Sequence, residues 1–517
     1  MASTPETGWT DISEAVFFHA RQRPDAVALI EGAERVSYGA FAPLVAAAAA
    51  HIRDLGVAPR EVVGVVMPGT IDHVVLSLAL IRVGAVPLEL PMPQDGEGTM
   101  PIMLHFGVRR AFVAAGVRPP GATPPDGLLV HEIDAGWRGT LPIGCADRRA
   151  AGTPDEDFYL SLTSGSTGLP KGIVTTRRQW QARYNTARKL FPFLLSPENP
   201  PHLLVVGGMA FSAFFFFLAN HLFAGGPVVL MTGAHQPDRL AAAINEWDDA
   251  AMMLTPPVAR EFLARAPGEG VMFPRLRALF IGAAPFFAAE KRAARDRLSP
   301  NCYEVYGSAA SGFLSSLAPL DIEAHGDSTG RPVEDVEIEI VDHEGGRVPP
   351  GRTGHIRVRG PGISKGFYRE TPGETAGGDG FRQGWYYPGD LGAFDDGYLR
   401  LKGRLGDVIR RRGVEIYPPD LEEVYLAHPA IREAAVVGAA EPGGGPDRRV
   451  IVFAVADAGL QARELTQHCR CRIPPERFPD QLFCLAQLPR TGNGKVDRPR
   501  LVAMAEQALA RTGQPAA

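Results

Sequence analysis

A segment rich in glycine and hydroxyl side chains, residues 162–172, is the first stretch whose residue types could do chemistry. It reads Leu-Thr-Ser-Gly-Ser-Thr-Gly-Leu-Pro-Lys-Gly, between an apolar run that begins at Phe158 and a β-type run that ends at Thr176. This pattern predicts a loop between two strands. Glycine lets backbone amides approach a ligand closely, while hydroxyls and one ammonium add donors. The segment therefore predicts a polyphosphate-binding loop, whose candidate residues are Thr163, Ser164, Gly165, Ser166, Thr167, Gly168 and Lys171.

The loop is not a Walker A motif. In that motif, the lysine is followed by Ser or Thr and opens a helix. Here Lys171 is followed by Gly172 and then by β-type residues. Taken alone, the segment could equally be a flexible surface loop of small residues, so its function depends on partners elsewhere in the chain.

The composition indicates a globular protein of several domains. A chain of 517 residues exceeds the size of one ordinary core, and 45% hydrophobic with 21% charged residues is typical of soluble domains. A net charge of −5 without a basic tail gives no indication of nucleic-acid binding. The cysteines are few, odd in number and scattered, which favours a reducing cytoplasm. They are Cys145, Cys302, Cys469, Cys471 and Cys484.

Neither a signal peptide nor a membrane span is predicted. The first residues lack a basic region followed by an apolar run. The most apolar segment, Met209 to Ala224, is shorter than the roughly 20 residues that span a bilayer, and polar residues interrupt it. We expect a buried helix there.

Strand-like and helix-like runs alternate over the first two-thirds of the chain, which predicts α/β layers with parallel sheets. The expected strands are 62–67, 202–207, 227–231, 252–254, 279–281 and 303–306, and the expected helices are 39–55, 71–82, 210–223, 238–247 and 288–298. From Val333 the texture changes, and residues 334–342 and 354–359 predict an antiparallel pair. A final unit has a helix-like run at 419–427 and strand-like runs at 434–437 and 450–455, so we place a boundary near residue 405.

Six motifs in order give the chain a close resemblance to the adenylate-forming superfamily, which includes acyl-CoA synthetases, peptide-synthetase adenylation domains and firefly luciferase. The similarity extends over nearly the whole chain, and acyl-CoA synthetases are the most similar class. The motifs are the loop 163–172, Leu276–Pro285, Tyr306-Gly307-Ser308, Gly384–Asp390, the segment from Gly403 to Pro418, and Pro489–Lys495.

The resemblance implies an α/β fold with two domains. A large N-terminal domain, residues 1–405, would contain layered α/β subdomains and a small β-barrel-like part. A small, mobile α+β domain, residues 406–517, would carry the catalytic lysine. The implied substrates are ATP with Mg²⁺, a small-molecule carboxylic acid and coenzyme A. The implied location is the cytoplasm, without nucleic-acid partners, and a homodimer is one option for the assembly.

The chemistry of acid activation explains the need for a cation. A carboxylate must approach the α-phosphate of ATP, and two unit charges about 4 Å apart repel by roughly 4 kcal/mol at a protein-like dielectric. By the resemblance, Lys495 on its glycine-flanked loop supplies the positive charge. Without the surrounding motif, Lys495 would be an ordinary exposed lysine.

Other residues receive nucleotide-binding roles from the same resemblance. Asp390 would accept hydrogen bonds from the ribose hydroxyls, Tyr306 would offer a ring face to adenine, and Arg404 would reach ribose or phosphate. Taken singly, they could be a turn residue, a core aromatic residue and a solvated charge. The remaining nucleotide-site candidates are Gly282, Ala283, Ala284, Gly307 and Ser308.

The first departure from the family is Ala310. The family's Tyr-Gly-x-Thr-Glu ends here in Ala309-Ala310, and the missing glutamate normally helps to hold Mg²⁺. Phosphate oxygens and water could suffice, another carboxylate could substitute, or adenylation could be slow or lost. We expect weakened but retained activity with a higher Mg²⁺ requirement, and we assign no metal ligand.

Two further departures concern movement and the acid. Gly406 occupies the hinge position that usually carries Asp or Lys, and glycine keeps a pivot possible. Amino-acid-activating relatives place an aspartate after the aromatic residue that aligns with Phe211, whereas Ser212 follows here. A buried ammonium without a carboxylate would be costly, so a fatty or aryl acid is expected. The substrate-site candidates are Phe211, Ser212, Phe215, Gly282 and Gly307.

The acyl acceptor stays open between coenzyme A and the phosphopantetheine arm of a carrier protein acting in trans. Arg410–Arg412 and Arg448–Arg449 could meet phosphates or an acidic partner, although such clusters are often solvated surface. A nucleotide- or acyl-binding protein that kept the fold but lost catalysis is the alternative from another class. Acid-dependent pyrophosphate exchange separates the two.

Overall fold

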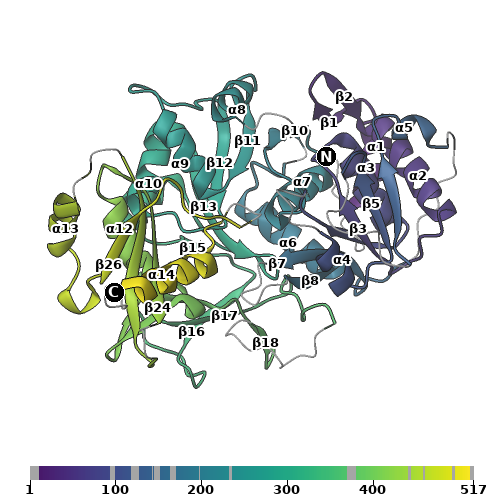
Figure 1. Cartoon of the computed structure of the whole chain (residues 1–517). Coiled ribbons are helices and arrows are strands. Elements are labelled where there is room, and N and C mark those ends of the chain that lie inside the picture. Colours follow the sequence, from purple (N-terminus) through teal and green to yellow (C-terminus); the bar gives the residue numbers. More distant parts are fainter. Residues whose placement is uncertain are drawn as a thin grey trace.

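A computed structural model provides the structure of the chain (Figure 1). It describes residues 11–92, 99–117, 127–142, 144, 152–163, 170–196, 198–231, 236–369, 380–440, 444–457, 460, 462–491 and 495–512. Within these residues, no helix is both long and apolar enough to cross a membrane.

A six-stranded sheet carries the two strands that flank the predicted phosphate loop. Its order is β6 (Leu129–Ile133), β5 (Arg110–Ala114), β3 (Val62–Val66), β4 (Val86–Glu89), β7 (Asp157–Thr163) and β8 (Lys171–Thr176). All neighbours are parallel except β7 and β8, which form an antiparallel pair. The two strands expected on either side of the phosphate loop are therefore confirmed, whereas residues 164–169 lie outside the described residues.

A nine-stranded sheet forms the second layer and contains the expected alternation of strands and helices. Its order is β15 (Arg331–Pro332), β14 (Gly312–Leu317), β13 (Cys302–Ser308), β12 (Leu276–Gly282), β11 (Ala250–Leu254), β9 (His202–Val205), β10 (Val228–Leu230), β1 (Val27–Glu31) and β2 (Glu34–Ser37). The neighbours from β13 to β1 are parallel, and the strands at both ends are antiparallel.

Helices connect and cover these sheets. They are α1 (Ile12–Gln22), α2 (Tyr38–Asp54), α3 (Ile71–Arg82), α4 (Met100–His105), α5 (Trp137–Thr140), α6 (Arg177–Leu190), α7 (Ser212–Ala224), α8 (Pro237–Ile244), α9 (Pro256–Arg265), α10 (Ala288–Ala293) and α11 (Ile322–His325). Helix α6 begins directly after β8 because Thr176 and Gln179 form a capping box, in which each side chain bonds the other residue's backbone amide. Helix α7 ends at Gly225, whose φ of 83° suits glycine.

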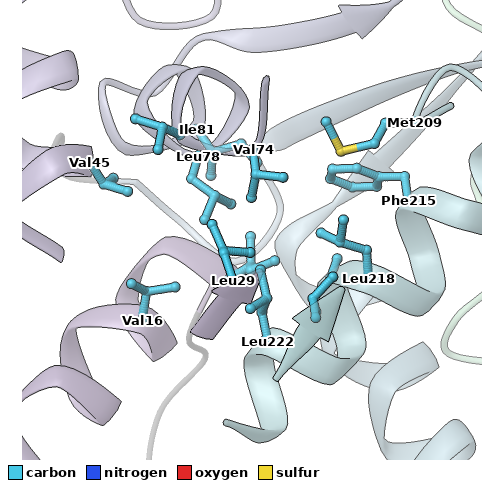
Figure 2. Packing of buried hydrophobic residues seen from close by; sticks show 14 of the residues in the cluster. Val16, Leu29, Val45, Val74, Leu78, Ile81, Met209, Phe215, Leu218 and Leu222 are labelled. Atoms are coloured by element: carbon cyan, nitrogen blue, oxygen red, sulfur yellow. The ribbon is translucent and has the colours of Figure 1, made fainter. Parts of the chain in front are cut away.

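The largest apolar core joins the two sheets through their helices. Figure 2 shows Val74, Leu78 and Ile81 of α3 facing Phe215, Leu218 and Leu222 of α7. The apolar segment 209–224 is thus a buried helix, as predicted. Burying a side chain of this size contributes about 1.5–3 kcal/mol, so this interface fixes the two α/β layers against each other.

The change of texture after Val333 marks a sheet of antiparallel strands. Its order is β18 (Gly380–Arg382), β19 (Trp385–Tyr387), β17 (Gly354–Arg359), β20 (Asp390–Asp395) and β21 (Tyr398–Arg404), with β16 (Glu337–Val341) paired to β17. The pairing of β16 with β17 confirms the antiparallel pair expected at residues 334–342 and 354–359.

The C-terminal domain is a small α+β unit, which lies on the opposite side of Figure 1 from α2 and α5. It contains β22 (Ile409–Arg411) with β23 (Val414–Ile416), and a three-stranded sheet of β24 (Ile431–Ala440), β25 (Arg448–Ala456) and β26 (Gln481–Cys484). Its helices are α12 (Pro418–Leu426), α13 (Ala462–Arg470) and α14 (Arg498–Thr512). It has apolar clusters of its own, which pack on both faces of β24 and β25.

Candidate active site

Three strands bring Tyr306, Asp390 and Arg404 together. Tyr306 lies on β13, while Asp390 and Arg404 lie directly opposite each other on β20 and β21. The Tyr306 hydroxyl donates to Asp390 Oδ2 at 2.7 Å, and Arg404 Nε donates to Asp390 Oδ1 at 3.2 Å. Arg404 Nη2 also donates to the carbonyl of Pro388 at 2.7 Å. Each carboxylate oxygen can accept a further hydrogen bond, so Asp390 retains capacity for two hydroxyls of a ligand.

The electrostatics of this trio follow from burial and from Asp390. Burial raises the pKa of Tyr306 well above its usual value, and the neighbouring negative charge of Asp390 adds to the shift. Attraction to Asp390 is the main cause that raises the pKa of Arg404. Tyr306 therefore stays a hydroxyl donor and Arg404 stays a cation at any working pH.

Lys495 of the C-terminal domain is affected by the charges of this trio. Burial lowers the pKa of Lys495, the positive charge of Arg404 lowers it further, and Asp390 raises it. Lys495 therefore lies within electrostatic range of both residues. Its backbone carbonyl accepts from the Thr491 amide at 2.8 Å and from the Thr491 hydroxyl at 3.2 Å, which closes the base of the lysine loop. The intervening residues 492–494 lie outside the described residues.

The phosphate-loop candidates are described only at the two ends of the loop. Ser164, Gly165, Ser166, Thr167 and Gly168 lie outside the described residues. Thr163 and Lys171 face each other as the last pair of β7 and β8, and the Thr163 hydroxyl donates to the Lys171 carbonyl at 3.4 Å. The Lys171 ammonium lies 4.6 Å from the centre of the Phe367 ring, a favourable cation–π distance.

Two candidate glycines have packing reasons of their own. Gly282 ends β12, and a Cβ there would lie 2.4 Å from the carbonyl oxygen of Val305 on the neighbouring strand. A Cβ on Gly307 would lie 2.1 Å from the carbonyl oxygen of Gly312. Both glycines are therefore required by close backbone contact between strands, independently of any ligand.

The residues beside these glycines form tight turns. Ala283 follows Gly282 with a φ of 74°, an unfavourable value for alanine, and Ala284 continues that turn. After Gly307, the Ser308 amide donates to the Ser311 hydroxyl at 3.0 Å, and the two hydroxyls lie 3.0 Å apart. Backbone strain of this kind persists only where the surroundings fix it, and functional sites are a common setting.

The expected acyl-site aromatics divide into two groups. Phe215 is 5% exposed and stacks on Tyr159 with ring centres 4.1 Å apart, so it belongs to the core shown in Figure 2. We therefore no longer propose that Phe215 lines the site for the acid substrate. The reason is the direction of its side chain from α7, which the sequence does not reveal because apolar residues occur on every side of that helix.

Three other aromatics of this segment, Phe211, Phe214 and Phe216, are partly exposed. Phe211 precedes α7 and contacts Phe214 with ring centres 5.5 Å apart, and the neighbouring Ser212 is also partly exposed. Phe216 meets Phe313 of β14 edge to face at 5.3 Å. Phe313 is a further candidate for the acyl site. Its aromatic type was the only feature of the sequence that pointed to it.

The hinge candidate Gly406 lies in the 3₁₀ turn Leu405–Asp407 and is exposed. A Cβ added to Gly406 would have no heavy atom within 4 Å. Lys402 and Asp420, on either side of this turn, form an ion pair at 3.1 Å between β21 and α12. The conformation seen here therefore does not itself require glycine at position 406.

A protein-held magnesium ion does not fit the residues present at the tyrosine–glycine motif. Ala310 is 0% exposed and packs with Ile173 and Phe367, and its side chain has no oxygen. Among the described residues, no group of three or more His, Cys, Asp or Glu side chains could hold a metal ion. No other carboxylate in the described part of the chain thus forms such a cluster in place of the missing glutamate.

The two arginine clusters of the C-terminal domain come together at β22 and β25. Arg411 is tied to Asp480 at 3.0 Å, and the Arg412 amide donates to Asp447 Oδ1 at 2.8 Å. Arg448, which follows Asp447, is exposed, as are Arg410 and Arg412. Arg411 and Arg410 therefore each have a carboxylate partner, since Arg410 pairs with Glu415 at 3.5 Å. The exposed Arg410, Arg412 and Arg448 remain candidates for an anionic acceptor.

Comparison with known proteins agrees with this architecture. The family model described as AMP-binding enzyme matches residues 16–368, and the model described as AMP-binding enzyme C-terminal domain matches residues 420–495. The chain is 27% identical to the feruloyl-CoA synthase of an Amycolatopsis species, over 92% of this chain and 95% of the relative. It is also 27% identical to the pseudomonine synthase of Pseudomonas entomophila, over 95% of this chain and 83% of the relative.

Solved structures share the whole fold. An anthranilate CoA ligase in complex with anthranoyl-AMP superposes with a TM-score of 0.86 at 20% identity, covering 98% of this chain and 100% of that structure. The o-succinylbenzoate CoA synthetase of Bacillus subtilis in complex with ATP and magnesium has a TM-score of 0.82 at 21% identity, covering 94% of this chain and 98% of that structure. At these identities, the likeness establishes the large N-terminal and small C-terminal α/β domains.

Proposed function

The chain belongs to the AMP-binding enzyme family, and on that basis we propose that it is an ATP-dependent ligase that joins a carboxylic acid to coenzyme A through an acyl-AMP intermediate. The observation that carries the proposal is the convergence of Lys495 with Asp390 and Arg404. Lys495 of the C-terminal domain lies within electrostatic range of Asp390, the carboxylate proposed to bind the ribose of the nucleotide. This arrangement suits a reaction between two anions.

In the first half-reaction, a carboxylate oxygen of the acid attacks the α-phosphorus of ATP. The bond between this phosphorus and the bridging oxygen of pyrophosphate breaks, and pyrophosphate leaves with the electron pair. Lys495 lowers the repulsion between the two anions by placing an ammonium beside them. Removing a preorganised cation or donor of this kind typically costs 10²–10³ in rate.

The N-terminal domain positions the nucleotide. Asp390 accepts the ribose hydroxyls, Tyr306 presents its ring to adenine, and Arg404 holds Asp390 while facing the phosphate side. The phosphate loop between Thr163 and Lys171 binds the leaving pyrophosphate. These roles are supported by the hydrogen bonds between Tyr306, Asp390 and Arg404 and by the match to the family.

In the second half-reaction, the thiol of coenzyme A attacks the acyl carbon, and AMP leaves. Lys495 occupies the approach to the adenylate, so we propose that residues 406–517 rotate as a mobile domain against residues 1–405. Gly406 would be the pivot. The open space around Gly406 and the single turn that contains it are consistent with this role.

The acid is proposed to be apolar, either fatty or aryl. The segment after Phe211 offers Ser212 instead of a carboxylate, and Phe214, Phe216 and Phe313 are partly exposed aromatic side chains. The relatives reported above include a feruloyl-CoA synthase, which fits an aryl acid. Ala310 implies that magnesium, if it accompanies ATP, is held without the usual glutamate.

A carrier protein loaded in trans is the alternative acceptor. It is favoured by the relative named pseudomonine synthase, and by the exposed arginines Arg410, Arg412 and Arg448. We keep the cytoplasm as the proposed compartment and a homodimer as an assembly to be checked by light scattering.

The test is a panel of fatty and aryl acids assayed for pyrophosphate and AMP release, with and without coenzyme A. The proposal expects acid-dependent pyrophosphate release without coenzyme A, and stoichiometric AMP and thioester with it. Thioester only with a phosphopantetheinylated carrier protein would favour the alternative acceptor. Nucleotide binding without acid-dependent pyrophosphate release for any acid would show a binding protein and overturn the proposal.

A further inference from the structure

Arg183 on α6 is a buried arginine whose five N–H groups are all used by neutral acceptors. Its side chain is 8% exposed. Nε donates to the carbonyl of Gly362 at 2.7 Å, Nη1 to Ala309 O at 3.0 Å and Thr175 Oγ1 at 3.4 Å, and Nη2 to Ala310 O at 2.9 Å and Ser364 Oγ at 3.0 Å. No carboxylate pairs with it in the described part of the chain. A buried cation normally has a carboxylate partner, so this arrangement requires an explanation.

The surrounding chain is shaped around this side chain. The Arg183 stem lies between Gly312 and Gly362, where added Cβ atoms would come within 3.1 Å and 2.9 Å of Arg183 Cγ. The Ala310 carbonyl, which accepts from Arg183, also accepts from the Ser364 amide at 2.8 Å, and the Ala310 side chain is short. Gly312, Gly362 and Ala310 thus have absent or short side chains, so the backbone around Arg183 is adapted to this arginine.

The segments that Arg183 joins border the proposed nucleotide site. Ala309 and Ala310 lie in the turn directly after the strand that carries Tyr306 and Ser308, and Thr175 lies on β8, which follows the phosphate loop. The segment that contains Gly362 and Ser364 leads to Phe367, whose ring faces the Lys171 ammonium. Arg183 is therefore a positioning residue for three segments: the turn at Ala309 and Ala310, strand β8, and the segment of Gly362 and Ser364.

The charge of Arg183 also changes what position 310 can do. Because the guanidinium already donates to the Ala310 backbone, a carboxylate placed at that position would lie beside a buried cation. An ion pair in that environment would hold the carboxylate away from a metal ion. Conversely, a neutral residue there leaves the positive charge free to act on a nearby anion.

We propose that Arg183 and Ala310 together replace the family's metal-binding glutamate, so that a fixed cation under the tyrosine–glycine turn attracts the polyphosphate of ATP without a carboxylate-held Mg²⁺. The proposal rests on the proposed function, because it assumes that this site binds ATP. It replaces the expectation of a raised Mg²⁺ requirement, which assumed that nothing compensates for the lost glutamate.

The test is ATP binding measured by isothermal titration calorimetry without any acid, once in EDTA and once with Mg²⁺. The wild-type chain should bind ATP in EDTA within about tenfold of its affinity with Mg²⁺. Arg183→Met should bind ATP in EDTA on the order of fivefold more weakly than wild type, since it removes one unit charge near the polyphosphate. Arg183→Lys, which keeps the charge, should lose less than Arg183→Met. The matched control is Arg178→Met, which removes an exposed arginine from the same helix and should bind as wild type does.

The variant Ala310→Glu tests the inference independently, because it leaves the buried Arg183 in place. Ala310→Glu should weaken binding in EDTA without increasing the benefit from Mg²⁺, since Arg183 captures the new carboxylate. Ala310→Glu combined with Arg183→Met should make ATP binding depend on Mg²⁺. Thermal unfolding would verify that each variant is folded, and if Arg183→Met is not, Ala310→Glu and Arg183→Lys decide.

The inference would be overturned by unchanged ATP binding in EDTA by a folded Arg183→Met, or by an Mg²⁺ benefit gained by Ala310→Glu alone. A wild-type chain that does not bind ATP would overturn it as well. If the chain binds ATP as expected but never forms acyl-AMP, the ligase proposal fails while this inference stands.

Discussion

Arg404 and Lys495, two cations from different domains, lie close enough for the charge of Arg404 to lower the pKa of Lys495. Asp390 opposes this effect, because its negative charge raises the pKa of Lys495. Asp390 also accepts a hydrogen bond from Arg404. The proposed catalytic ammonium is therefore held at a place prepared for an anion, where it gains most from the arrival of substrate phosphate.

The pH dependence of adenylation follows from the lowered pKa of Lys495. The ammonium is present below this pKa and is lost as pH rises through it, so the adenylation rate should fall at a lower pH than an ordinary lysine would give. The measurement is acid-dependent pyrophosphate release against pH. In Lys495→Arg, the alkaline fall should move upward or disappear, with each profile scaled to its own maximum. Identical profiles would mean that another group causes the fall.

Removal of the Lys495 ammonium should separate the two half-reactions. Lys495→Ala should slow acyl-AMP formation by about 10²–10³ and leave thioester formation from added acyl-AMP within a few-fold of wild type. The control is Arg500→Ala, which removes an exposed positive charge from α14. Near wild-type adenylation by Lys495→Ala would contradict the assignment.

The hydrogen bond between Tyr306 and Asp390 should stabilise both the protein and its nucleotide complex. Tyr306→Phe keeps the ring but removes the donor at 2.7 Å, so we expect a loss of about 0.5–1.5 kcal/mol in unfolding free energy and several-fold weaker AMP binding. Denaturant unfolding and calorimetry measure the two effects. Tyr387→Phe, which removes a longer contact with Arg357 at 3.4 Å, is the comparison variant and should change AMP binding little.

Gly406 should matter for movement rather than for the conformation described here. Gly406→Ala should retain adenylation, because a Cβ at this position has open space. Gly406→Pro restricts the backbone and should impair thioester formation more than adenylation. Single-turnover assays of each half-reaction test this, and equal losses in both would rule out a hinge role.

The two groups of aromatic side chains should respond differently to truncation. Phe215→Ala creates a core cavity and should cost about 3–5 kcal/mol of unfolding free energy. Phe216→Ala, which breaks the contact with Phe313, should cost less and should shift the acid preference toward bulkier acids. The acid panel and thermal unfolding check this, and an unchanged acid profile for Phe216→Ala would remove it from the acyl site.

Much of the fold is determined locally and could therefore be predicted. Apolar runs such as Val62–Val66 predict buried strands because a parallel sheet is covered on both faces. The motif residues Tyr306, Asp390 and Arg404 could be selected as a group because each lies in a motif of the family resemblance. That these three residues lie close together was an inference from the family resemblance. The hydrogen bonds from Tyr306 and Arg404 to Asp390 show how they are arranged.

What the sequence by itself determined was the α/β layering, the phosphate-loop strands, the family and the identity of the candidate lysine, since each is encoded in neighbouring residues. Only the tertiary structure decided that Phe215 faces the core and that Arg183 binds the carbonyls of Ala309, Ala310 and Gly362. The physical reason is that a helix with apolar residues on every side has no polar face to mark its orientation, and a buried arginine is satisfied by backbone groups far along the chain. Such partners exist only once the chain has folded.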